Sequence, residues 1–464
     1  MIINFLIIIQ GNMLEKFFKL KENHTDVKTE VLAGITTFMT MAYILAVNPT
    51  MLADAGMDKT AVLIATCLAA FVGTLVMALL ANYPFALAPG MGLNAYFAYT
   101  VCSDMGYSWQ VALMAVFIEG IIFIVLSLTN VREAIFNAIP ATLKKGVSAG
   151  IGLFIAFIGL QGAHIVVSNE STLLSGVKFA ENWNTEGICA VLALIGLMVT
   201  AILYIKKVKA SILIGILVTW ILGMLCQVTG IYHVDVKTGY YSLYPTLEMT
   251  DFSAITKTFG QCFNADFHNV GIFNFIVVLF SFLFVDMFDT LGTLIGVSDK
   301  AGMLDKDGKL PRVKQALLAD AIATSTGAVL GTSTTTTFVE SSAGVGAGAR
   351  TGLSSVVTAF LFLISILFAP IFKAIPGFAT APALIFVGFL MISAIVKIDF
   401  EDFTEAIPAY LCLIAMPLMY SIAEGIAIGV ISYVIINLIC GKAKKITPLM
   451  YILAVLFVCK YIFL

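Results

Sequence analysis

Charged residues are scarce in this chain. Only 12% of its 464 residues are charged and 60% are apolar, whereas water-soluble domains carry roughly 25% charged and about 45–50% apolar residues. A water-soluble surface cannot be built from this composition, so we predict a single body embedded in the lipid bilayer. The formal net charge of −2 offers no basic surface for phosphate groups, which excludes nucleic acid as a partner.

Several chemical signatures are also missing. No Gly-x-x-x-x-Gly-Lys-Ser/Thr pattern is present, which argues against ATP-driven chemistry. The eight cysteines follow no pairing or metal-ligand spacing. No nucleophile–base pair stands out within the apolar runs. We therefore expect neither an enzyme nor a bound cofactor or metal.

Long apolar runs follow one another with short loops. A membrane helix needs about 20 apolar residues. Candidate spans are 30–51, 61–81, 110–129, 141–161, 187–205, 210–229, 272–297, 313–331, 352–371, 380–397, 403–420 and 422–440. The tail 447–464 is apolar enough for a further span or for a helix lying at the interface.

Two stretches between these spans look like broken membrane segments. Residues 84–103 carry Pro and Gly, and residues 332–348 carry runs of Thr, Ser and Gly, all of which weaken a continuous helix. Non-helical backbone at membrane depth survives only where it is buried in protein or lines a cavity. These two stretches are therefore where we expect a functional site.

Lys and Arg residues predict the orientation. If residues 1–29 are cytoplasmic and both broken stretches cross, every Lys/Arg cluster falls on the cytoplasmic side. This predicts fourteen crossings of the cell membrane, with an extracytoplasmic loop at 230–271. The seven-segment halves are then 30–229 and 272–440, followed by the apolar tail 441–464.

The two halves also share short repeats. Ala-Gly-Met at 55–57 recurs at 301–303, and Ala-Ile-Pro at 138–140 recurs at 374–376. Each half has an odd number of crossings, so the second is inverted relative to the first. Inverted repeats with paired discontinuous segments are typical of secondary transporters, whose substrate site lies near the membrane midplane.

Few ionisable side chains fall inside the spans, and each is costly there. Asp286 and Asp289 lie three residues apart on one helix face, with Thr293 one turn further. Glu340 and Asn94 lie in the two broken stretches. Polar groups thus converge from segments three, eight and ten. Because an unpaired carboxylate in low dielectric takes up a proton, these acids are candidates for proton coupling. Alternatively, Asp286 only bonds backbone or hydroxyl groups of segment ten and holds the bundle together.

Other intramembrane acids have two open interpretations. Glu119 is either functional or satisfied by a neighbouring Ser or Thr. Asp320 is close in sequence to Thr324 and Ser325, and it either contacts the Thr-rich stretch structurally or takes part in function.

Four runs resemble a known family. Residues 34–44, 88–97, 288–294 and 337–344 resemble signatures of the adenine/guanine/hypoxanthine permeases, within the nucleobase:cation symporter type 2 group. The resemblance covers the chain from about residue 14 to its end. It implies two inverted seven-segment repeats, a core and a gate domain, a short strand in each of segments three and ten, and a homodimer.

The resemblance also implies roles for particular residues. Asp289 and Glu340 match the family's substrate-binding acids, and Asn94 matches a polar position of the purine branch. Thr293 stands where a related pyrimidine permease has a histidine, which places the proton coupling on the carboxylates. Phe338 is positioned to stack on a purine ring. The predicted function is therefore import of purine nucleobases with protons.

Two rival functions remain open at this stage. An anion transporter of the sulfate or bicarbonate type would place positive charge or helix N-termini at the site, and two acids there argue against it. A passive channel would not need paired broken segments.

Overall fold

The protein is almost entirely helical. The computed structural model describes residues 14–129, 139–169, 171–235, 240–245, 249–268, 270–300, 302–303 and 310–463. Within these residues, ten helices are long and apolar enough to cross a membrane. The multi-pass membrane protein expected from composition is confirmed. The apolar run near the N-terminus, residues 2–9, lies outside the described residues.

Helices of the first half begin close to the predicted span boundaries. They are α2 (Val27–Met41), α3 (Ile44–Asp54), α4 (Lys59–Leu80), α6 (Trp109–Leu128), α8 (Ala141–Gly162), α9 (Ile188–Ile205) and α10 (Ser211–Val228). Asp26 and Asp58 cap α2 and α4 by accepting backbone N–H bonds from Thr29 and Ala61. α2 and α3 are separated only by a tight turn and together form one span.

The second half of the chain is likewise a series of helices. Its helices are α11 (Ile272–Lys300), α12 (Val313–Leu330), α14 (Gly352–Ser365), α15 (Ala369–Lys373), α16 (Gly377–Ile392), α17 (Phe403–Leu418), α18 (Ile422–Ile439) and α19 (Pro448–Phe463). α12 and α17 fall outside the ten long apolar helices. α17 has only 16 residues and contains two prolines, and α12 has a buried Asp320.

The broken stretches contain short strands, as the family resemblance implied. β1 (Leu87–Pro89) leads into α5 (Met91–Ala95) and the π-helix η1 (Tyr96–Asp104), and β4 (Thr335–Thr337) leads into α13 (Ser341–Gly346). β1 and β4 pair antiparallel, with Leu87 opposite Thr337 and Pro89 opposite Thr335. The strands join segments that are about 250 residues apart in sequence.

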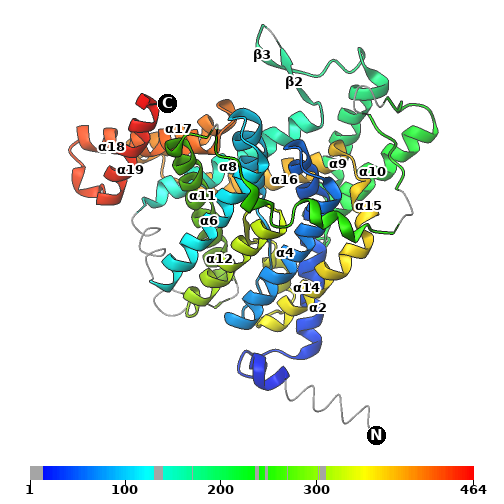
Figure 1. Ribbon diagram of the computed structural model, residues 1–464, viewed down its shortest axis with the longest axis horizontal. Coiled ribbons are helices and arrows are strands. Elements are labelled where there is room, and N and C mark those ends of the chain that lie inside the picture. The colour runs from blue at the N-terminus through cyan, green and yellow to red at the C-terminus, as the bar shows by residue number, and fades with distance from the viewer. Residues whose placement is uncertain are drawn as a thin grey trace.

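The long helices pack as two groups. The first helix group comprises α2, α3, α4, α6, α11, α12 and α14, and the second comprises α8, α9, α10, α16, α17 and α18. Figure 1 shows α2, α4, α12 and α14 of the first group side by side. Small residues permit close packing inside each group. For example, a Cβ on Gly120 would lie 2.2 Å from Ser325 Oγ, and one on Gly388 would lie 2.4 Å from the Gly152 carbonyl oxygen.

The loops and the tail pack around the bundle. A hairpin of β2 (Val166–Asn169) and β3 (Leu173–Gly176) projects beyond the helices (Figure 1). The polar stretch after α10 contains the short 3-10 helices η4 (Phe252–Lys257) and η5 (Gln261–Asn264). For the apolar tail, the sequence left open a further span or a helix at the interface. The tail forms α19 and packs against α18.

Candidate functional site

The candidate site is built around the β1–β4 pair. A two-stranded sheet has two outer edges, and at membrane depth their backbone groups need partners. Thr74 of α4 serves the edge of β1: its hydroxyl accepts from Leu87 N at 2.9 Å and donates to Leu87 O at 3.0 Å. Thr324 of α12 donates to Thr335 O of β4 at 3.1 Å. Helix hydroxyls thus replace the missing outer strands.

Glycine is required where the two broken segments approach most closely. Gly90 N donates to Thr334 O at 3.0 Å, which extends the strand ladder by one bond. A Cβ at Gly90 would lie 2.6 Å from Thr336 Cγ2 and 3.5 Å from Asp289 Oδ2. Gly90 therefore leaves room both for the strand pair and for an acidic side chain from α11.

Asp289 directs its carboxylate at this break in the helices. Its side chain is partly accessible, and it has no hydrogen-bond partner among the residues that the structure describes. It lies close enough to Glu340 and Asp320 for electrostatic repulsion. An acceptor without a partner, inside a membrane protein, is available for the N–H groups of a ligand.

Glu340 reaches the same place from the end of β4. The hydroxyl of Tyr43, which is 1% exposed at the turn between α2 and α3, donates to Glu340 Oε1 at 2.6 Å. The glutamate side chain remains partly accessible. The predicted convergence of segments eight and ten is therefore present in the fold, and segment one contributes Tyr43 to it.

A second acidic cluster lies beside the strands. The Thr290 hydroxyl is 2.9 Å from Asp286 Oδ1, 3.0 and 3.1 Å from the two oxygens of Asp320, and 2.6 Å from Thr336 Oγ1. All four side chains are almost wholly buried. A hydroxyl has one hydrogen to donate. Thr290 can therefore donate to only one of these oxygens at a time, and the two carboxyl groups lie close together around its hydroxyl.

Asn94 joins the two broken segments directly. Its Oδ1 accepts a short hydrogen bond from the Ser333 hydroxyl, and its Nδ2 donates to Pro89 O at 3.4 Å. The side chain is fully buried. An amide has two hydrogens, so one hydrogen of Asn94 has no partner among the described residues, and its ligand role stays a prediction.

The remaining predicted residues have simpler surroundings. Glu119 accepts a 2.8 Å bond from the Thr334 hydroxyl. This is the kind of contact expected if a neighbouring Ser or Thr satisfies Glu119. Phe338 is 6% exposed, and its N–H donates to Ala86 O at 3.0 Å at the end of the strand ladder. Thr293 is partly accessible on α11. The ligand roles of Phe338 and Thr293 stay predictions.

The sequence analysis missed Tyr43, Thr290 and Ser333. Thr290 lies four residues after Asp286, a helical spacing that could have revealed their bond. Tyr43 stood within one of the family-like runs, but nothing in the sequence indicated its partner. Ser333 belonged to a run of hydroxyl residues with no feature that singled it out.

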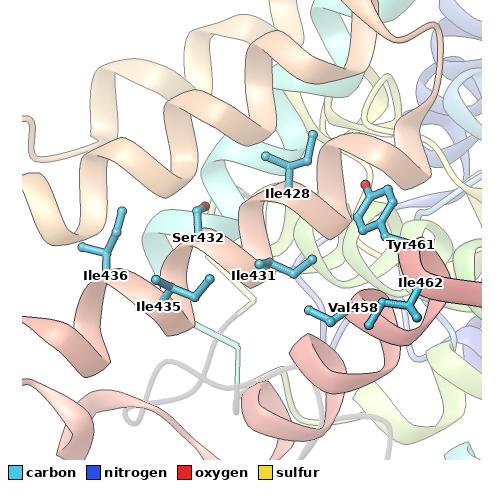
Figure 2. Close-up of a pocket in the computed structure, with 8 residues that line it drawn as sticks. All are labelled: Ile428, Ile431, Ser432, Ile435, Ile436, Val458, Tyr461 and Ile462. Carbon is cyan, nitrogen blue, oxygen red and sulfur yellow. The ribbon is translucent and has the colours of Figure 1, made fainter.

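Neither a metal site nor the groove at the C-terminal helices is a better candidate among the described residues. Among the described residues, no group of three His, Cys, Asp or Glu side chains could hold a metal ion. A groove of about 470 Å³ lies between α18 and α19, and Figure 2 shows the side chains that line it. It is lined by Ile428, Ile431, Ser432, Ile435, Ile436, Val458, Tyr461 and Ile462. Two hydroxyls among aliphatic side chains offer little to a polar heterocycle, so the groove is not the substrate site.

A multi-pass helical bundle with two paired broken segments and carboxylates at the break is the arrangement of a secondary transporter. The comparisons agree with this class. The model of the permease family Xan_ur_permease matches residues 28–445, and the chain belongs to this family of membrane transporters. The family expected from the motifs is confirmed.

Curated relatives align over nearly the whole chain. The chain is 42% identical to an adenine permease of Escherichia coli over 452 residues, covering 97% of this chain and 96% of that protein. It is 46% identical to a guanine/hypoxanthine permease of Bacillus subtilis over 462 residues, covering 97% and 100%. Among solved structures, the transmembrane domain of a cyanobacterium bicarbonate transporter matches with a TM-score of 0.61 at 18% identity, covering 87% of this chain and 97% of that one. This last match concerns the fold alone.

Proposed function

We propose that this protein imports purine nucleobases, namely adenine, guanine or hypoxanthine, together with protons across the cell membrane. The observation that carries the proposal is the meeting of Asp289 and Glu340 at the paired break of segments three and ten. The substrate class is supported by the printed names of the relatives, which align end to end with this chain.

We infer fourteen crossings in two inverted repeats, with residues 1–29 cytoplasmic. The support is that the two halves place equivalent residues around the strands. Thr74 of α4 and Thr324 of α12 bond β1 and β4 from opposite sides. Their neighbours also meet, since a Cβ on Gly73 would lie 2.7 Å from Ala323 Cβ. The first helix group is then the core domain and the second is the gate domain.

The substrate is held by hydrogen bonds along its edge and by stacking. Purine ring and amino N–H groups donate to the free oxygens of Asp289 and to Glu340, whose orientation Tyr43 fixes. Phe338 stacks on the ring, and Thr293 and Asn94 meet the remaining polar atoms. A compound lacking these N–H groups would leave buried acceptors unpaired, which costs about 1–3 kcal/mol for each neutral group and more for a carboxylate.

Protons are held by the two acidic clusters. Asp289 and Glu340 repel each other, so a proton on either one lowers the cost of closing the site around a neutral base. The carboxyl groups of Asp286 and Asp320 both bond the Thr290 hydroxyl, and two buried carboxylates so close together disfavour full ionisation, which makes this cluster a second place to keep a proton. Binding a base and a proton together makes the import a symport.

Uptake of labelled adenine, guanine and hypoxanthine at acidic and alkaline external pH tests the proposal. We expect wild-type uptake to rise at acidic pH and Glu340→Gln and Asp289→Asn each to abolish it. Glu181→Gln, an exposed acid paired with Lys178, is the matched control and should transport normally. Full transport by either site variant would remove that residue from the site, and uptake that follows sodium rather than pH would exclude proton coupling.

An anion transporter is the second candidate, because the matched structure with a similar fold transports bicarbonate. Two neighbouring carboxylates disfavour an anion at the same place. Bicarbonate or sulfate in excess should therefore leave purine uptake unchanged. We also expect a homodimer, which the molar mass of the detergent-solubilised protein would test.

A further inference from the structure

A second cavity lies away from the candidate site. It measures about 750 Å³, within the range of about 300–1,000 Å³ typical of small-molecule pockets. It is lined by the end of α3 and the start of α4, together with the end of α8, the start of α9, α15, the start of α16 and the loop after α10. It therefore lies between the two helix groups, one full span away from the start of α2.

Aromatic rings form one wall of this cavity. The Tyr232 ring centroid lies 6.3 Å from that of Tyr240 and 6.4 Å from that of Phe378, and the His164 ring is 6.2 Å from Tyr240. All four residues line the cavity. Tyr240 is partly accessible, whereas Tyr232 and Phe378 are buried. Such a wall offers flat apolar surface to a planar ring.

The cavity also carries hydrogen-bonding groups of both kinds. Asp54 Oδ2 accepts a 2.8 Å bond from the Tyr99 hydroxyl, and the other carboxylate oxygen has no bond among the described residues. Lys59 Nζ donates to Ile375 O at 3.3 Å and has two further hydrogens. One side of the cavity thus presents acceptors and donors together, as the edge of a purine does.

We propose that this cavity is an outer binding site for the purine base, separate from the Asp289–Glu340 site. The base lies against Tyr240 and presents its edge to Asp54 and Lys59 before it moves to the membrane centre. The inference rests on the proposed function, and it adds a second site for the same class of substrate. Asp54 also connects this site to the central one, because its partner Tyr99 belongs to η1, which continues from the α5 helix that carries Asn94.

Tryptophan fluorescence can report occupancy of the cavity. The chain has three tryptophans, and Trp220 donates a 2.8 Å bond to the carbonyl of Leu243, which lines the cavity. A protein with Trp109→Phe and Trp183→Phe retains only this reporter. Adding Glu340→Gln disables the central site. Adenine is then titrated against the purified full-length protein in lipid nanodiscs, alongside equilibrium binding of labelled adenine.

In the Glu340→Gln background we expect one saturable adenine site with a change in Trp220 fluorescence. Tyr240→Ala should weaken this binding about tenfold, in line with the loss of one base–ring contact, whereas Tyr240→Phe should retain it. Absence of saturable adenine binding in the Glu340→Gln protein, while wild type still takes up adenine, would overturn the outer site and leave the proposed function standing. Equal affinity of Tyr240→Ala and Tyr240→Phe would also overturn it. If wild type neither binds nor transports any purine, the proposed function itself fails.

Discussion

Tyr43 and Glu340 are 297 residues apart in sequence and are joined by a 2.6 Å hydrogen bond from the phenol to the carboxylate. The bond connects the turn between α2 and α3 with the end of β4. A glutamate side chain has several rotatable bonds, and a single strong donor fixes one of its oxygens and leaves the other for a ligand.

Tyr43→Phe removes this donor without changing the packing of the ring. We expect the affinity for purine to fall by about ten- to a hundredfold, because hydrogen bonds to charged groups contribute about 1.5–3 kcal/mol. Concentration-dependent uptake measures the effect. Tyr204→Phe on α9, where the ring is 46% exposed, is the matched control. An unchanged half-saturation concentration in Tyr43→Phe would show that Glu340 needs no orientation by Tyr43.

Asp320→Asn tests whether Asp320 carries a coupling proton beside Thr290. Asparagine supplies permanently the hydrogen that a protonated Asp320 would donate, so we expect a folded protein whose uptake depends less on external pH. Asp320→Leu, which removes both donor and acceptor beside Thr290, should lower the thermal stability instead. The pH profile of uptake and the melting temperature separate these effects. An Asp320→Asn protein with the wild-type pH profile would exclude Asp320 from the coupling.

Gly90→Ala places a methyl group 2.6 Å from Thr336 Cγ2. Overpacking of this kind typically costs about 1–3 kcal/mol, and here it pushes the two strands apart next to Asp289. We expect loss of uptake with a lower melting temperature. Gly346→Ala, at the end of α13 with no atom within 4 Å of the new Cβ, should behave as wild type. Normal uptake by Gly90→Ala would show that the strands tolerate separation.

Asp402 links the ends of α17 and α18 outside the membrane. Its carboxylate accepts from the Thr404 hydroxyl at 2.7 Å and from Lys442 Nζ at 2.9 Å, and Lys445 Nζ lies at 3.3 Å. The Thr404 hydroxyl, followed by Lys442 and Lys445, holds the pKa of Asp402 well below its usual value of 3.8.

A depressed pKa means that the folded protein favours the charged carboxylate. This stabilisation is present above pH 3.8 and is lost as the pH falls below that value toward the pKa of the folded state. We therefore expect Asp402→Asn to melt at a lower temperature than wild type at neutral pH, and the gap to narrow below pH 3.8. A gap that stays constant with pH would mean that the charge of Asp402 does not contribute.

Most of the fold was predictable because this chain has few charged residues, so that each long apolar run is readily assigned to a membrane helix. The start of α11 at Ile272 and the start of α8 at Ala141 coincide with the predicted spans. The Pro and Gly content of 84–103 marked a broken segment from composition alone. The strands themselves came only from the family resemblance, because three residues such as Leu87–Pro89 carry no periodicity.

Asp289 and Glu340 lie near each other in the structure, their roles in binding stay predictions, and the sequence did not predict their partners. Asp289 and Glu340 could be singled out because carboxylates are rare inside apolar spans. The bonds of Tyr43 and Asp320 depend on which helices pack together, and a single sequence does not contain that information. Asp286, with its alternative interpretation as a bundle contact, bonds the hydroxyl of Thr290 on its own helix, and Thr290 in turn lies 2.6 Å from Thr336 of segment ten.

The threonine bonds that flank the strand pair have a mechanical consequence. Each strand is fastened sideways to a long helix, β1 to α4 through Thr74 and β4 to α12 through Thr324. Sliding the polar break past those helices would strip carbonyl and N–H groups of their partners in hydrocarbon, at a cost of several kcal/mol. We expect the break to travel with α4 and α12 as one block, so that access from either face of the membrane changes by displacement against α8 and α16.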